Sequence, residues 1–240
     1  MVCVASPLGG RYVNSGKRRT GLMESNVFER TNIGEPEISS RLYNLTIGAV
    51  LCWGFWVNWL MVGNIPVESI TSINPWIFFI GYLASCFFGI YLFSKSSNPL
   101  VSFAGYNFVV VPFGLIINIV VSNYDPSLVL EAIKVTGLVT GIMMLLGTMF
   151  PVFFQKISGA LTIALIAVIV VELFQIFILG IHQEWLDWAV VIIFCGYIGY
   201  DWGRANQIPK TIDNAVDSAA ALYMDIINLF LRIVRIMGRK

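Results

Sequence analysis

Charged residues are scarce in this chain of 240 residues. Asp, Glu, Lys and Arg make up 12% of it, 57% of the residues are hydrophobic, and the mean hydropathy is +0.78. This is about half the charged share of an ordinary soluble domain, so the chain has too few charges to cover a soluble surface. The composition indicates an integral membrane protein whose main partner is the lipid bilayer, and we expect no nucleic-acid partner.

Cysteine pairs, a metal-binding cysteine motif and a cleavable signal are also missing. Three of the four cysteines lie within apolar stretches and none belongs to a CxxC pair, so we expect free thiols rather than disulfides or metal ligands. The first forty residues are polar, and we expect no cleavable signal among them. We predict a disordered cytoplasmic tail over residues 1–41 and a membrane domain over residues 42–240.

Long apolar runs dominate the rest of the chain. Between residues 42 and 205 the charged residues fall between runs of about 20 apolar residues, the length that a helix needs to cross ~30 Å of hydrocarbon. Membrane strands would alternate apolar and polar residues, whereas residues 163–171 are apolar throughout, which disfavours a β-barrel. The predicted spans are 42–62, 76–94, 100–122, 128–150, 157–180 and 186–204, followed by a more polar seventh over 216–237.

The distribution of basic residues predicts how the spans are oriented. Arg and Lys gather before the first span and then at Lys95, Lys156 and Arg204, in alternate connections, whereas the opposite connections carry mainly acids. By the positive-inside rule the amino terminus is cytoplasmic. Short connections without a large appended domain suit a multi-pass protein of a bacterial plasma membrane, with the endoplasmic reticulum membrane as the alternative.

The last segment leaves two folds open. Six spans would keep the basic carboxyl-terminal cluster in the cytoplasm, whereas a seventh would place it outside, against the positive-inside rule. Small residues over 218–221 would nevertheless let a polar helix pack closely inside a bundle. We therefore expect an all-α integral membrane protein, a seven-helix transmembrane bundle with the last helix central, and keep six spans plus a re-entrant segment as the alternative.

Glycines four residues apart occur twice within the predicted spans, at Gly137 and Gly141 and at Gly199 and Gly203. Small residues at this spacing let two helices approach closely, and the same pattern occurs in dimer interfaces. We expect ordinary close helix packing at both places.

Two aspartates near the carboxyl terminus are the main site prediction. Asp201 and Asp225 are 24 residues apart and the midpoint, residue 213, lies near a turn, so two antiparallel helices would carry both to similar depth, roughly 15 Å from the turn. An ionised aspartate costs ~2.5 to 3.5 kcal/mol within a bilayer, and two that share a proton relieve that cost. Such a pair titrates as a unit and would sense pH, and its ionised oxygens suit Ca²⁺, although they supply only part of the usual shell of about six to eight oxygens.

Five further polar residues could support this pair. They share helix faces with the two aspartates or lie within a predicted span, and they are Tyr197, Arg204, Asp217, Asn228 and Glu172. A purely structural explanation stays open, in which Asp201 pairs with Arg204 and Asp225 hydrogen-bonds neighbouring Tyr or Asn side chains. Glu172, alone in the fifth span, belongs to a hydrated path or is a protonated, hydrogen-bonded acid.

Residues 196–201 (GYIGYD) and 214–231 (NAVDSAAALYMDIINLFL) resemble the Bax inhibitor-1 family, the transmembrane BAX inhibitor motif proteins, bacterial members included. The resemblance is strongest over the last fifty or so residues. It implies seven helices with the last in the centre, no cofactor, and a pH-sensitive calcium leak gated by Asp201 and Asp225, with Ca²⁺ and protons as the ions. Family members can carry a basic latch residue in the second helix, but here no Lys or Arg occurs between Arg41 and Lys95, and Lys95 sits at a helix end.

Three classes of function follow from these residues and the resemblance. A pH-gated calcium pathway is the leading hypothesis, and a regulator that binds other membrane proteins in stress or cell death is the alternative. Paired aspartates on adjacent helices are also superficially similar to intramembrane aspartyl proteases, but the second motif, Tyr-Met-Asp-Ile, lacks their Gly-x-Gly-Asp. No HExxH, GxSxG or phosphate-binding loop occurs either, so we expect no enzyme.

Overall fold

The computed structural model describes residues 36–175 and 184–239, and these are helical with no strand among them. The elements are α1 (Ser40–Asn64), α2 (Val67–Thr71), α3 (Pro75–Lys95), α4 (Pro99–Val121), α5 (Pro126–Met149), α6 (Pro151–Phe174), α7 (Glu184–Ala205) and α8 (Ile212–Met237). Seven long helices therefore coincide with the seven predicted segments. The predicted tail over 1–41 lies almost entirely outside the described residues, as does the end of the predicted span 157–180.

Local sequence explains where the helices begin. The side chain of the residue before α1, α3, α4 and α8 accepts a hydrogen bond from a backbone N–H of the first turn, and these residues are Ser39, Asn74, Asn98 and Thr211. Proline starts α3, α4, α5 and α6, where its missing N–H costs nothing. Pro151 begins α6 directly after Phe150, so the prediction that this span starts at residue 157 was wrong, and Lys156 lies within the helix rather than in a connection.

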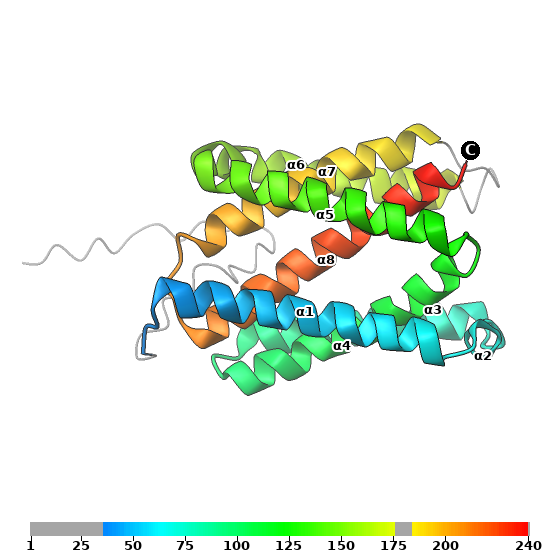
Figure 1. The fold of residues 1–240 in the computed structure, drawn as a ribbon, viewed down its shortest axis with the longest axis horizontal. Helices are drawn as coiled ribbons and strands as arrows, with labels where there is room; N and C mark the ends of the chain where they lie inside the picture. Colours follow the sequence, from blue (N-terminus) through cyan, green and yellow to red (C-terminus); the bar gives the residue numbers. More distant parts are fainter. Residues whose placement is uncertain (1–35, 176–183, 240) are drawn as a thin grey trace, which may run out of the picture.

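Two layers of three helices enclose α8 (Figure 1). In one layer α4 packs between α1 and α3, and in the other α7 packs between α5 and α6. Helix α8 contacts α1 and α4 from the first layer and α5 and α7 from the second, and in the described part of the chain the layers meet mainly through it. Most of α8 is buried, whereas the described residues of α6 bury only Phe154. Helix α8 is thus the central helix of the bundle.

Hydrogen bonds from the first layer hold α8 in place. Ser102 of α4 donates to Asp213 at 2.6 Å, and the Tyr43 hydroxyl of α1 lies 3.1 Å from the Ser218 hydroxyl. Further along both helices, Asn58 donates to the Tyr223 hydroxyl at 2.6 Å. These groups are buried, so each bond satisfies a polar atom that would be costly to leave unpaired. The polar character of α8 is therefore compatible with its central place.

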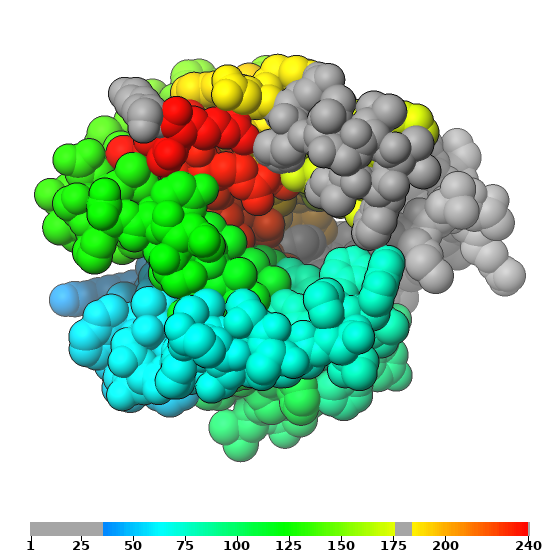
Figure 2. Space-filling view, turned by 90° about the vertical axis from the view of Figure 1, so that its right-hand side faces the viewer, coloured from blue at the N-terminus to red at the C-terminus, as the bar shows by residue number. Residues whose placement is uncertain are grey.

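Helices α1 and α8 run in the same direction. Tyr43 near the start of α1 contacts Ser218 near the start of α8, while Asn58 and Tyr223 meet further along both. In Figure 1 both helices accordingly run from left to right. Figure 2 looks onto the end where they finish and shows the end of α8 (red) beside the start of α7 (yellow), with the end of α1 and α2 (cyan) below. Both helices thus cross the bundle from one end to the other.

The outer helices have the properties of membrane spans. Five described helices, α1, α3, α4, α5 and α6, are long and apolar enough to cross a membrane. Large apolar side chains on them point outward, including Ile80, Leu138 and Ile163. Helices α7 and α8 carry more charged residues, so neither contains a stretch apolar enough to be identified as a membrane span by composition alone. The fold is the helical bundle of an integral membrane protein.

Glycines make a close helix crossing between α5 and α7. A Cβ added at Gly147 would lie 2.3 Å from the carbonyl oxygen of Gly199, and one at Gly203 would lie 2.8 Å from that of Gly147. The prediction of close packing at Gly199 and Gly203 is therefore confirmed. A Cβ at Gly137 or Gly141 would meet nothing within 4 Å, so the same prediction was wrong for that pair.

We expect Gly147→Ala to destabilise the bundle by about 1–3 kcal/mol, because the new methyl group would meet a backbone carbonyl that cannot turn aside. Gly141→Ala, two turns earlier on α5, places the same methyl group in open space and should leave stability unchanged or slightly higher. Unfolding of the purified variants by titration with denaturing detergent measures both. Equal unfolding midpoints for the two variants would contradict the close crossing.

Candidate functional site

A short turn joins α7 to α8 and sets them antiparallel. Helix α7 ends at Ala205 and α8 begins at Ile212. The backbone N–H of Asn214 donates to the Thr211 hydroxyl at 3.1 Å, and the Asn214 side-chain amide donates to the carbonyl of Pro209 at 2.7 Å. With the turn held in this way, residues equally far from it face each other across the two helices, as the sequence predicted.

Asp201 and Asp225 are brought into contact by this arrangement. Their side chains hydrogen-bond to each other, and each residue is 7% exposed. An ionised carboxylate only accepts hydrogen bonds, so the bond between them requires that one of the two carries a proton. Oδ2 of Asp225 is buried and has no other hydrogen-bond partner among the described residues. The packed bundle therefore holds two buried carboxyl groups in contact between α7 and α8.

Two of the predicted supporting residues flank Asp201 on α7. The Tyr197 hydroxyl, one turn before it, donates to the Thr162 hydroxyl of α6 at 3.0 Å and lies near both aspartates. Arg204, three residues after it, donates to the Tyr200 hydroxyl. Asp201 lies near both Asp225 and Arg204, so its contact with Asp225 exists beside an attraction to Arg204.

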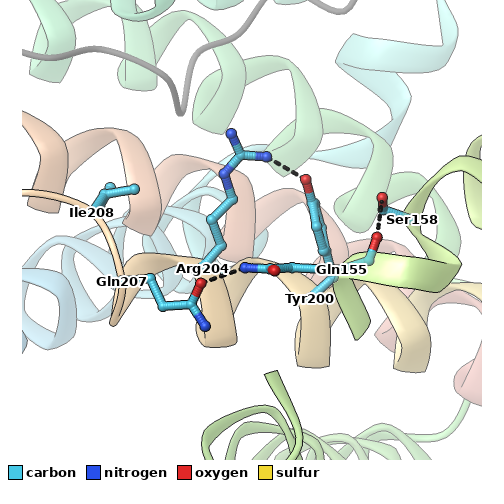
Figure 3. A pocket seen from close by; sticks show the side chains of 6 residues that line it. All are labelled: Gln155, Ser158, Tyr200, Arg204, Gln207 and Ile208. Atoms are coloured by element: carbon cyan, nitrogen blue, oxygen red, sulfur yellow. Dashed lines mark hydrogen bonds between the residues drawn. The ribbon is translucent and has the colours of Figure 1, made fainter. Parts of the chain in front are cut away.

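A polar cavity of about 340 Å³ adjoins this site on the side of the turn (Figure 3). Side chains from α6, α7 and the turn line it, namely Gln155, Ser158, Tyr200, Arg204, Gln207 and Ile208. Gln155 donates to Gln207 across it, and Figure 3 shows the Arg204 guanidinium reaching over to the Tyr200 hydroxyl. Neither aspartate lines this cavity, which lies at the same end of α7 as Asp201.

The remaining polar residues predicted on α8 lie apart from the carboxyl pair. Asp217 is buried two turns nearer the turn, close to Tyr43. Asn228 donates to the carbonyl of Met224 in its own helix at 2.8 Å. Asp213, which the sequence analysis did not single out, is fully buried and accepts the bond from Ser102. Buried acids thus continue along α8 from the pair toward the turn.

Glu172 belongs to an ionic cluster at the opposite end of α8. Both of its oxygens accept bonds of 2.7 Å from Arg232. Arg232 also lies 2.8 Å from Asp187, whose side chain is 0% exposed, and Asp187 pairs further with Arg235 at 3.2 Å and with Arg239. Glu172 is therefore an ion-paired acid, which neither alternative drawn from the sequence described.

Only half of the signal for this cluster is visible in the sequence. Arg232, Arg235 and Arg239 recur at steps of three and four, which places them on one face of a helix. Their partners come from the end of α6 and the start of α7, and only the packing of three helices brings them together. The sequence analysis counted Asp187 only among the acids of the opposite connections. The structure buries its side chain and pairs it with arginine.

Two carboxyl groups carry four oxygens between them, fewer than the full shell of Ca²⁺. Among the described residues no group of three or more His, Cys, Asp or Glu side chains could hold a metal ion. A resident Ca²⁺ needs about six to eight oxygens, so these residues do not fit a permanent calcium site. Lys95, considered above as a latch, is the last residue of α3, which packs against α4. Two buried carboxyl groups in contact have the chemistry to bind and release protons as a unit.

Comparison of the sequence with known proteins identifies its relatives. The family model described as "Inhibitor of apoptosis-promoting Bax1" matches residues 36–240. An uncharacterized protein of Helicobacter pylori is 30% identical over 182 residues, which cover 74% of this chain and 77% of that protein. Inner membrane protein YbhL of Escherichia coli is 28% identical over 140 residues (53% of this chain, 58% of YbhL), and an uncharacterized membrane protein of Streptococcus pyogenes is 28% identical over 133 residues (52% and 58%). The chain therefore belongs to the Bax inhibitor-1 family of membrane proteins.

Proposed function

We propose that this protein is a passive, pH-sensitive pathway for cations, with Ca²⁺ as the permeant ion and Asp201 and Asp225 as its gate. The observation that carries the proposal is the buried hydrogen bond between two carboxyl groups on adjacent helices. Buried titratable groups that hold each other across a helix interface are rare in membranes and are most often functional.

The proton shared by the pair links pH to helix packing. With one proton present, the two carboxyl groups bond and hold α7 against α8. Without it, two negative charges lie side by side in a medium of low dielectric constant, where repulsion is far stronger than in water. Separation of α7 from α8 relieves that repulsion. The bundle then has two arrangements whose populations depend on the protonation of the pair.

The surroundings of the pair suit a cation rather than an anion. A polar cavity lies at the same end of α7 as Asp201, and buried acids continue along α8 at Asp217 and Asp213. Carboxylate oxygens attract hard cations such as Ca²⁺. At the far end the arginines of the ionic cluster are held by Glu172 and Asp187, so their charges are offset by acids.

We also propose that all seven long helices cross the inner membrane of a bacterium, with the amino terminus in the cytoplasm and the carboxyl terminus outside. Helix α8 has 26 residues and is therefore ~39 Å long, enough to span the bilayer. It runs parallel to α1, which is apolar enough to cross. The positive-inside rule would place the carboxyl-terminal arginines in the cytoplasm. Here these arginines are paired with buried acids, and we propose that this pairing allows them to lie outside.

A second candidate function rests on the family description, which names an inhibitor of a cell-death factor. Such a protein would act by binding other membrane proteins and would need no ion pathway of its own. We expect no catalysis in either case, since the pair lacks the sequence motif of aspartyl proteases.

Calcium flux into liposomes that contain only the purified protein and a calcium dye tests the proposal. We expect flux that changes between pH 5 and pH 8 in the native protein and a flat profile in Asp201→Asn and in Asp225→Asn, because neither variant can form the proton-sharing acid pair. Asp125→Asn, an exposed aspartate in the α4–α5 connection, serves as the control and should behave like the native protein. An unchanged pH profile in both dyad variants would overturn the gate, and no flux at any pH would favour the binding function.

A further inference from the structure

A second cavity, of about 370 Å³, lies between the two layers on the half of the bundle away from the polar cavity. Side chains of α1, α4, α5 and α8 line it, among them Trp59, Ile133, Gly137, Ile227 and Phe230. The layers meet mainly through α8 in the described residues, and Figure 1 shows α8 passing between α1 and α5. The cavity therefore opens between the layers and has the central helix as its floor.

The lining of this cavity offers almost nothing to a polar molecule. Two of its residues are polar, Asn58 and Thr136. The Thr136 hydroxyl donates to the carbonyl of Ala132 at 2.7 Å, and the Asn58 amide N–H donates to the Tyr223 hydroxyl at 2.6 Å, which leaves the Asn58 Oδ1 as the one lining side-chain oxygen without a partner among the described residues. A water needs two to four polar partners to be held in a cavity, so the site favours an apolar occupant.

The mouth of the cavity identifies what that occupant is. Trp59 is 70% exposed and Ile133 is 52% exposed, and both lie on helices that are apolar enough to cross a membrane. The surface around the mouth is therefore in contact with the hydrocarbon of the bilayer. Acyl chains are the apolar molecules present at that depth, and an empty cavity would forfeit dispersion contacts that a chain would restore.

We propose that this lateral cavity takes one acyl chain of a bilayer lipid, which enters between α1 and α5 and lies against α8. Ile226 and Ile227, which line the cavity, directly follow Asp225. A bound chain therefore packs against the helix that carries half of the carboxyl pair. The proposal concerns lipid binding and stands whether or not the pair gates an ion pathway.

Photolabelling with a phosphatidylcholine that carries a diazirine in its acyl chain tests this inference in reconstituted vesicles. Trp59 would be labelled by bulk lipid in any case. Ile227 and Phe230 are 5% and 8% exposed behind the outer helices, so a lipid chain reaches them only through the cavity. We expect label on these two residues of α8, mapped by mass spectrometry. A native protein whose α8 carries no label would overturn the proposal and would leave the cavity to a protein segment such as a second copy of the chain.

A matched pair of glycine variants sharpens the result. Gly137 lines the cavity and a Cβ there meets nothing within 4 Å, so Gly137→Leu should narrow the cavity without displacing a neighbour and lower the label on α8. Gly141→Leu adds the same side chain one turn away, outside the cavity lining, and should keep the label. Equal labelling of α8 in the two variants would show that lipid reaches α8 by another route and would contradict the proposal. The label in the native protein decides the question even if one variant fails to fold.

Discussion

Replacing Arg232 by alanine should lower the stability of the folded protein by about 3 kcal/mol, the lower end of the cost of breaking a buried ion pair from one side. The guanidinium makes two bonds of 2.7 Å to Glu172 and lies 2.8 Å from Asp187. Asp187 has no exposed side-chain surface, and without Arg232 its charge is offset only by Arg235 and Arg239. The change weakens the packing of three helices, because the cluster joins the end of α8 to α6 and α7.

Detergent-induced unfolding of purified Arg232→Ala measures this loss. Arg232→Lys keeps the charge but cannot bond both oxygens of Glu172 as a planar fork, so it should lie between alanine and the native protein. Arg204→Ala is the comparison at the other end of the bundle, where the arginine donates to a tyrosine hydroxyl, and it should cost much less. Native stability in Arg232→Ala would show that the cluster does not hold the helices together.

Much of the helix layout could be predicted because each signal for it is local. Runs of about 20 apolar residues fix the number and the approximate limits of the outer helices. The antiparallel pair α7 and α8 followed from equal distances to a turn, and this was enough to predict that Asp201 and Asp225 would face each other. The error at the start of α6 has a local cause as well, since Pro151 allows a helix to begin where the hydropathy pattern was still read as a connection.

The partners of the charged residues could not be predicted in the same way. Glu172 and Arg232 are 60 residues apart, and their bond depends on which helices become neighbours in the bundle. The glycine pairs show the same limit. Gly199 and Gly203 meet Gly147 on α5, whereas Gly137 and Gly141, with identical spacing, meet nothing. Spacing defines a helix face, and packing decides what that face touches.

A cysteine appended after the last residue should react with a membrane-impermeant thiol reagent added from outside intact cells. This all-or-none result is expected because α8 runs parallel to α1 and ends at the same end of the bundle as the start of α7 (Figure 2). In the proposed topology that end faces outward. The native cysteines are first replaced by serine or alanine, so that the added thiol alone reports its side of the membrane.

Two further single cysteines calibrate this measurement. Lys95→Cys lies at the exposed end of α3, on the proposed cytoplasmic side, and Asp125→Cys lies in the exposed α4–α5 connection, on the proposed outer side. The terminal cysteine should react together with Asp125→Cys and not with Lys95→Cys. Reaction together with Lys95→Cys would return the carboxyl terminus to the cytoplasm, which requires six spans and a re-entrant α8. The paired arginines would then face the side that the positive-inside rule assigns to them, and neutralisation by Glu172 and Asp187 would no longer be needed to explain where they lie.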